Sequence, residues 1–194
     1  DFANPYAQLA YCYGYLGATG QLKAEHAYGK ANELGDKARQ LDPTLYQAHL
    51  IMALGDLYYT GNLDHAYDSF MEAIRLNPGA AFDDQYYTIY LGAIGNLNEA
   101  LETIEKAVKL DPLSLAINHW YGTVLLMFKR YDDAIARYDF VLSLDPTFRS
   151  ALEAKGWALY FKGDTKAAIN TLKKYQSMTG SPLKGLNGLG YIYG

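Results

Sequence analysis

The clearest hydrophobic pattern lies in the second half of the chain. Residues 115–128 are mostly apolar and contain no proline, which predicts one helix. A short polar stretch, 129–133, follows it, and in residues 134–142 the apolar positions recur with helical spacing. This segment therefore predicts two helices joined by a tight turn.

The same pair of helices recurs along the chain with a fixed period. Proline closes a Leu-Asp-Pro or Leu-Asn-Pro tripeptide at steps of 35, 34 and 34 residues. The series that share this period are Pro43, Pro78, Pro112 and Pro146; Ala66, Ala100, Ala134 and Ala168; Gly61, Gly95 and Gly163, with Lys129 in the remaining place; and Gly122, Gly156 and Gly190. Several series with one period establish an internal repeat.

The residues at each turn have the properties that a helix pair needs. A glycine in the left-handed conformation is expected to end each first helix, and Asn62, Asn96 or Asp164 to cap the next one. Asn96 and Glu99 have the spacing of a capping box. The proline step then ends the second helix, and the small alanine lets the two helices approach closely.

These residues resemble the tetratricopeptide repeat (TPR), a helix–turn–helix unit of 34 residues. The match is specific over about residues 44–180, where Phe70, Ile104, Tyr138 and Leu172 take the family's large position in the second helix. The resemblance implies an all-α fold, a right-handed superhelical solenoid of antiparallel helix pairs. It divides residues 1–194 into an irregular first repeat (about 4–43), repeats two to five (about 44–180) and a partial sixth repeat (183–194), all in one array.

The ends of the chain depart from the pattern. Residues 21–40 predict an extended or bent second helix in repeat one, after a first helix around residues 9–13, and residues 1–5 look like the tail of a turn between repeats. Because a solenoid needs capping elements at its ends, we expect a fragment of a longer protein, or ends that pack against neighbours. Simple fraying at both ends is the alternative.

Composition and charge exclude several functions. The chain has 17 Lys and Arg against 21 Asp and Glu, a net charge of −4, and half of its residues are hydrophobic. That balance argues against a nucleic-acid or anionic membrane surface, and no apolar run is long enough to cross a bilayer. The single cysteine, Cys12, lies in an apolar helix, is expected to be buried, and fits a cytoplasmic location.

No pattern of catalytic or metal-binding residues is found. The four histidines, His26, His49, His65 and His119, do not have metal-ligand spacing. The glycine-rich segments 14–20 and 185–194 follow no predicted strand, and Asp132 and Asp133 start a helix, where carboxylates are favourable. We therefore expect no enzyme activity, no metal and no cofactor.

The resemblance also implies where a partner would bind. In TPR proteins the first helix of each repeat lines a concave groove, and the family's groove positions fall on Ile51, Gly55, Tyr58 and Tyr59; Gln85, Ile89, Gly92 and Ala93; His119, Thr123, Leu126 and Met127; and Glu153, Trp157, Tyr160 and Phe161. The candidate binding residues are the ring-bearing ones together with their neighbours: Tyr11, Tyr15, Tyr58, Tyr59, Tyr86, His119, Trp120, Trp157, Tyr160, Phe161 and Tyr191. The alternative is that these rings pack between helices. The clamp that holds a chaperone's C-terminal carboxylate is absent, because Lys and Asn do not occupy its positions.

These observations predict a non-catalytic interaction module that binds a peptide or protein segment in an aromatic groove. Residues 111–135 resemble TPR regions appended to bacterial transcription activators and nucleotide cyclases, which implies a regulatory or signalling protein. A small-ligand sensor that controls an attached effector domain is one alternative. Self-association through open repeat ends is another.

Overall fold

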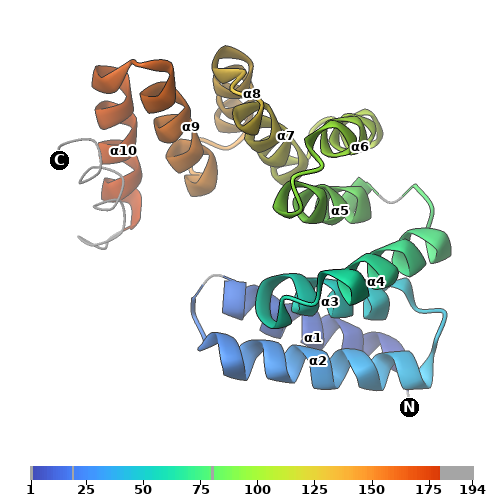
Figure 1. The fold of residues 1–194 in the computed structure, drawn as a ribbon. Helices are drawn as coiled ribbons and strands as arrows, with labels where there is room; N and C mark the ends of the chain where they lie inside the picture. The colour runs from blue at the N-terminus through green and yellow to red at the C-terminus, as the bar shows by residue number, and fades with distance from the viewer. Residues whose placement is uncertain (1, 19, 80, 180–194) are drawn as a thin grey trace. The chain divides into compact units, whose positions relative to one another are not determined.

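The computed structural model describes residues 2–18, 20–79 and 81–179, and within them every regular element is helical, with no strand. The elements follow one another as helix pairs (Figure 1). They are α1 (Ala3–Ala18), α2 (Ala24–Leu41), α3 (Tyr46–Gly55) with a π-helical turn η1 (Asp56–Thr60), α4 (Leu63–Leu76), α5 (Ala81–Ala93), α6 (Leu97–Leu110), α7 (Leu115–Met127), α8 (Tyr131–Leu144), α9 (Arg149–Lys162) and α10 (Thr165–Thr179). The all-α fold class is confirmed.

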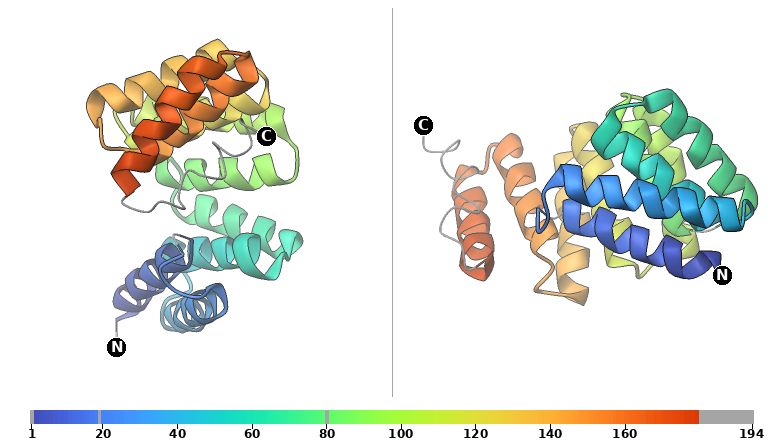
Figure 2. Two further views of the ribbon diagram at one scale, coloured as in Figure 1. Left: turned by 90° about the vertical axis from the view of Figure 1, so that its left-hand side faces the viewer. Right: turned by 90° about the horizontal axis from the view of Figure 1, so that it is seen from below.

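The chain forms two compact units, residues 1–90 and 91–194, and the division falls within α5. In the first unit α1 packs against α2 and α3, and Figures 1 and 2 show α1 and α2 side by side in opposite directions. In the second unit α7 packs on α8, α8 on α9, and α9 on α10. Each unit therefore has its own apolar core.

The turns inside the helix pairs adopt the expected left-handed backbone. Gly61, Gly95 and Gly163 have φ angles of 72°, 79° and 97°. Lys129, in the place without glycine, also has a positive φ, 58°. A side chain in this conformation costs roughly 1–2 kcal/mol, so the turn geometry is retained even where the residue type opposes it.

Two of the three expected helix caps are confirmed. The Asn62 side-chain oxygen accepts a hydrogen bond from the His65 N–H at 3.2 Å, and Asp164 accepts one from the Ala167 N–H at 3.0 Å. The capping prediction for Asn96 was wrong: its side-chain amide donates to the Glu99 carboxylate at 2.6 Å and caps no backbone group. A charged acceptor forms the stronger hydrogen bond, so it takes the amide away from the helix end.

The repeated small residues mark where two helices touch. The four periodic alanines are fully buried, and their large partners in the second helices are at most 1 % exposed. A Cβ atom at Gly122 would lie 2.6 Å from the Tyr138 ring, and one at Gly156 would lie 2.6 Å from Leu172. The period of the sequence is thus a requirement of packing within each helix pair.

In repeat one, the structure confirms one of two predictions about its helices. The extended second helix is present as α2, an uninterrupted helix of 18 residues. The expected turn at the N-terminus is wrong from Ala3 onward, because α1 already begins there. Pro5 fits in this first turn, where its missing N–H would have no helical acceptor. The partial sixth repeat lies outside the described residues.

The one repeat with a 35-residue step contains an extra residue in its first helix. Pro43 and Gly61 are 18 positions apart, whereas the equivalent residues of the next three repeats are 17 apart. The π-helical turn η1 accommodates it, and the Gly61 N–H donates to the Asp56 carbonyl, five residues back, at 2.8 Å. Wider turns of this kind are how a helix accepts an insertion without losing its register.

Candidate binding site

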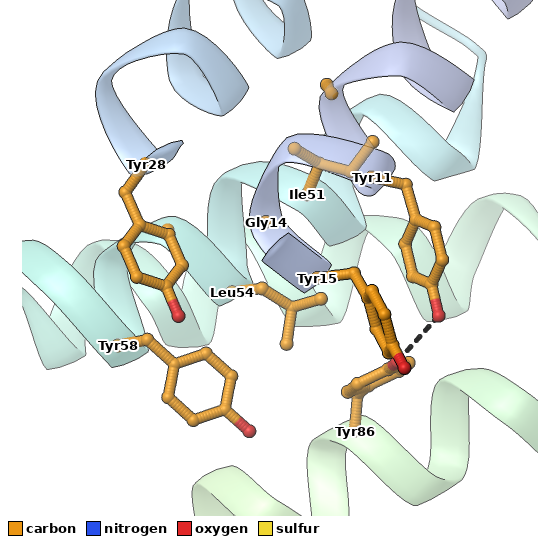
Figure 3. Close-up of a pocket in the computed structure, with 10 residues that line it drawn as sticks. Tyr11, Gly14, Tyr15, Tyr28, Ile51, Leu54, Tyr58 and Tyr86 are labelled. Atoms are coloured by element: carbon orange, nitrogen blue, oxygen red, sulfur yellow. Dashed lines mark hydrogen bonds between the residues drawn. The ribbon is translucent and has the colours of Figure 1, made fainter. Parts of the chain in front are cut away.

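A pocket in the first unit brings together five tyrosines from four elements (Figure 3). It has a cavity volume of about 100 Å³. Its lining, called here the tyrosine pocket, consists of Ala10, Tyr11, Gly14, Tyr15, Tyr28, Ile51, Leu54, Gly55, Tyr58 and Tyr86. Four of the predicted binding residues, Tyr11, Tyr15, Tyr58 and Tyr86, are therefore assembled in one place.

Local helix geometry explains how α1 contributes to the pocket. Tyr11 and Tyr15 are four residues apart, so they lie on the same face of α1. Gly14 lines the pocket beside them, and a Cβ placed there would meet no atom within 4 Å. The missing side chain of Gly14 thus leaves open space between helices that are otherwise closely packed.

The tyrosine rings hold one another in place. Tyr28 of α2 stacks on Tyr58 and Tyr59 of η1, with ring centroids 6.4 and 5.8 Å apart. The hydroxyls of Tyr11 and Tyr86 are hydrogen-bonded at 3.3 Å, which joins α1 to α5. In Figure 3, Leu54 lies between these two groups of rings.

The tyrosine pocket is uncharged. None of its lining residues is Asp, Glu, Lys, Arg or His. Burial raises the pKa of Tyr58 to about 12, and burial together with the hydrogen bond between its hydroxyl and that of Tyr11 raises the pKa of Tyr86 above its usual range. The phenols of Tyr58 and Tyr86 therefore stay neutral at physiological pH and offer hydrogen-bonding hydroxyls on an apolar surface.

A second cavity of about 500 Å³ lies next to the first and shares Tyr11 and Ile51 with it. Its other lining residues, which define the amide pocket, are Asn4, Ala7, Gln8, Cys12, Tyr46, Gln47 and Leu50. The side-chain oxygen of Gln47 is buried and has no hydrogen-bond partner among the described residues. The prediction that Cys12 is buried was wrong: the residue is exposed at this cavity.

Three candidates of the second unit, Trp157, Tyr160 and Phe161, form an aromatic row on α9. Trp157 stacks on Phe161 at a centroid distance of 6.0 Å, and Phe161 stacks on Tyr131 of α8 at 6.5 Å. Tyr160 contacts both Trp157 and Phe161 edge to face. Phe161 is 52 % exposed, so this row offers apolar surface to solvent.

His119 of α7 belongs to the packing between helices, and Trp120 is half-buried beside it. The His119 ring lies within 6 Å of the rings of Trp120, Tyr138 and Phe148. Burial lowers the pKa of His119 to about 4, and the imidazole is therefore neutral at physiological pH. Gln85, also at a family groove position, is only 4 % exposed.

Sequence reasoning missed part of the lining and included residues outside it. Tyr28 was not expected, because it lies on a second helix and nothing in its spacing indicates that its ring reaches η1. Tyr59 stacks on Tyr28 but does not line the pocket. Tyr191 lies outside the described residues. The amide pocket was not predicted, because no spacing in the sequence indicates that Asn4, Gln8 and Gln47 line one cavity.

Neither a metal site nor a membrane-spanning helix is found among the described residues. There, no group of three or more His, Cys, Asp and Glu side chains is arranged to hold a metal ion. Across the same residues, no helix is both long and apolar enough to cross a membrane.

Comparisons with known proteins agree with this fold. Residues 89–146 and 129–182 each match the tetratricopeptide repeat family, whereas curated protein sequences give no match. The chain is similar in structure to PilW, a type IV pilus biogenesis factor (24 % identity, TM-score 0.77, 97 % of this chain and 86 % of that chain). It is also similar to PilF of Pseudomonas aeruginosa (20 %, 0.72, 95 % and 79 %). A third similar structure is YrrB, a TPR protein with an unusual peptide-binding site (20 %, 0.62, 97 % and 92 %).

At these identities the solved structures establish the fold, and the family match establishes the repeats. Residues 89–182 are tetratricopeptide repeats, and the described chain has the all-helical fold of proteins built from such repeats.

Proposed function

We propose that this chain is a non-catalytic binding module that anchors a segment of a partner protein in the tyrosine pocket. TPR proteins generally mediate protein–protein interactions, and one structural relative is a peptide-binding TPR protein. The observation that carries the proposal is the pocket itself, an uncharged cavity lined by five tyrosines on the first helices of the repeats and on α2. Tyrosine is among the residues that dominate binding energy at interfaces.

The dimensions of the site favour a peptide. Pockets that enclose a small molecule usually have volumes of about 300–1,000 Å³. The tyrosine pocket, at about 100 Å³, has room for one apolar side chain. The adjoining amide pocket offers polar groups to the neighbouring part of the same segment. An extended chain satisfies both pockets at once.

The test fills the pocket without removing any of its walls. Gly14→Leu places a side chain in the open space beside Tyr11 and Tyr15, and replacing a helical glycine should raise helix stability by up to about 1 kcal/mol. Gly29→Leu is the matched control, since Gly29 is an exposed glycine on α2 with equally free space around it. Peptides of twelve residues selected from a random phage-displayed library supply the ligand, and their affinities are measured by fluorescence anisotropy.

We expect Gly14→Leu to weaken the selected peptides at least about tenfold, which corresponds to about 1.4 kcal/mol, while Gly29→Leu leaves their affinity unchanged. Both variants should be at least as stable as the unaltered protein. If selection yields no peptide, or if Gly14→Leu binds the peptides as tightly as the control does, the tyrosine pocket is not the binding site.

A small-ligand sensor is the second candidate, and the volume of the amide pocket, about 500 Å³, favours it. A metabolite that binds only the folded state raises the melting temperature. Thermal shift with a metabolite library separates the two functions: a shift that Gly14→Leu leaves intact assigns sensing to the amide pocket.

We further propose, from the sequence resemblance alone, that the chain works in the cytoplasm as part of a bacterial regulatory or signalling protein. The genomic sequence on both sides of the segment encoding residues 1–194 tests this. A DNA-binding or cyclase domain there would support it. Light scattering over a range of concentrations tests self-association, which a constant monomer mass would exclude.

A further inference from the structure

We infer that the partner segment carries basic side chains next to its apolar anchor, and that acidic or phosphorylated segments are rejected. This inference rests on the proposed function, whose site it uses. The preference is indicated by the charge of the rest of the first unit, because the lining of the tyrosine pocket is itself uncharged.

Charge is unevenly distributed along the chain. Residues 1–90 contain eleven Asp and Glu against five Lys and Arg, a net formal charge of −6, whereas residues 91–194 have a net charge of +2. The five basic residues of the first unit all lie in α2, at its N-cap, or in α4: Lys23, Lys30, Lys37, Arg39 and Arg75. The elements that carry most of the lining, α1, α3, η1 and α5, contain no Lys or Arg.

Three of the five basic residues pair with an acidic residue on their own helix. Lys30 pairs with Glu33 at 2.6 Å, Arg39 with Asp36 at 3.1 Å, and Arg75 with Glu72 at 2.7 Å, each three residues apart. The unit keeps an acidic excess, and neither pocket is lined by Lys or Arg. An uncompensated field of one sign attracts ligands of the opposite sign and repels those of the same sign.

The amide pocket adds a short-range preference of the same kind. Gln47 lines the amide pocket, and its buried side-chain oxygen has no donor among the described residues, which is unfavourable for an acceptor. Lysine and arginine bring donors and no acceptors, whereas a carboxylate or phosphate brings only acceptors. Since the two pockets share Tyr11 and Ile51, the basic residue must be close in sequence to the apolar anchor.

The experiment uses the library-selected peptides described above. Their composition is compared with that of the unselected library, and the tightest binder is remade with its Lys and Arg changed to Gln and, separately, to Glu. We expect enrichment of basic residues within two positions of the anchor. The Gln peptide should bind about fivefold more weakly than the parent, and the Glu peptide at least about twentyfold more weakly. Raising the ionic strength to 0.5 M should reduce both differences.

A variant of the protein tests whether Gln47 contributes to the preference for basic peptides. Gln47→Leu removes the unpaired oxygen and should lower the ratio between the affinities of the parent and Gln peptides. Gln40→Leu, at an exposed glutamine on α2, is the matched control and should leave that ratio as it was.

The two proposals fail in different ways. If the selected peptides lose affinity in Gly14→Leu but are acidic, or bind equally well after Lys and Arg become Glu, the basic preference is wrong and the proposed function stands. A selection that yields no peptide overturns both.

Discussion

At the scale of single residues, burial decides the chemistry of several polar side chains. His119 is surrounded by Trp120, Tyr138 and Phe148, so its charged form loses hydration without gaining a counter-ion. The pKa of His119 falls to about 4 for that reason. The same desolvation raises the pKa of Tyr138 to about 12. Both groups are neutral packing residues at physiological pH.

This predicts how stability depends on pH. The unfolded chain protonates His119 near pH 6.5, whereas the folded chain does so only near pH 4, so the free energy of unfolding falls as the pH decreases between these values. One pKa unit corresponds to about 1.4 kcal/mol, which gives a loss of roughly 3 kcal/mol. Urea denaturation at pH 7 and pH 4 should show a correspondingly smaller loss in His119→Gln. Equal losses in both proteins would contradict this account.

At the scale of secondary-structure elements, the first helix of repeat two has an extra residue. The turn η1 takes up that residue, so the parts of the helix on either side keep the positions that the repeat requires. Tyr58 remains three residues before Gly61, and Asp56 remains close to Thr60 and His65, to which its carboxylate is hydrogen-bonded. An insertion that would rotate a regular helix by about 100° is absorbed locally.

Deleting Leu57 should therefore be tolerated. The deletion restores the 17-residue spacing of the other repeats, and its cost is limited to the loss of a half-buried leucine, at most about 1.5 kcal/mol. Deleting Leu126, a half-buried leucine in α7, shortens a regular spacing and should cost at least about 3 kcal/mol or prevent folding. Thermal denaturation followed by circular dichroism compares the two. Similar destabilisation by both deletions would show that η1 is not an absorbed insertion.

At the scale of the whole molecule, the chain consists of units whose contacts are mainly with their neighbours in sequence. In repeat proteins stability is a sum over repeats and adjacent interfaces, so damage to one repeat has a local effect. The tryptophans report on one region only, because Trp120 and Trp157 both lie in residues 91–194. Circular dichroism instead reports on all helices.

The variant Gly122→Ala tests whether the two units unfold separately, because tryptophan fluorescence reports on residues 91–194 and circular dichroism on all helices. The added methyl group would overlap the buried Tyr138 ring, which should cost about 1–3 kcal/mol. We expect the urea midpoint from tryptophan fluorescence to fall, while circular dichroism shows a second transition at the original midpoint. Gly29→Ala, whose added atom meets nothing within 4 Å, is the control and should change neither signal much. If both signals move together in Gly122→Ala, the chain unfolds as one cooperative unit.

Much of the fold could be predicted because each repeat satisfies local rules. The glycine at Gly61 and the asparagine at Asn62 act within a few residues of the turn that they form, so their roles are visible in the sequence. The cap predicted at Asn96 does not form, because the nearby Glu99 carboxylate binds its side chain instead. The candidate site was harder to predict. Spacing placed Tyr11 and Tyr15 on one face, but it could not show that Tyr28 crosses from a second helix.

By itself, the sequence determined that the chain folds as repeated helix pairs, because periodic alanines, glycines and prolines each set a local conformation or a contact within one pair. Only the tertiary structure decided which tyrosines enclose a cavity and which residues pack between helices. His119 and Tyr58 both came from family groove positions, yet one is enclosed by other rings and the other lines an open pocket. Burial depends on what neighbouring helices place around a side chain, and helical spacing carries no information about that.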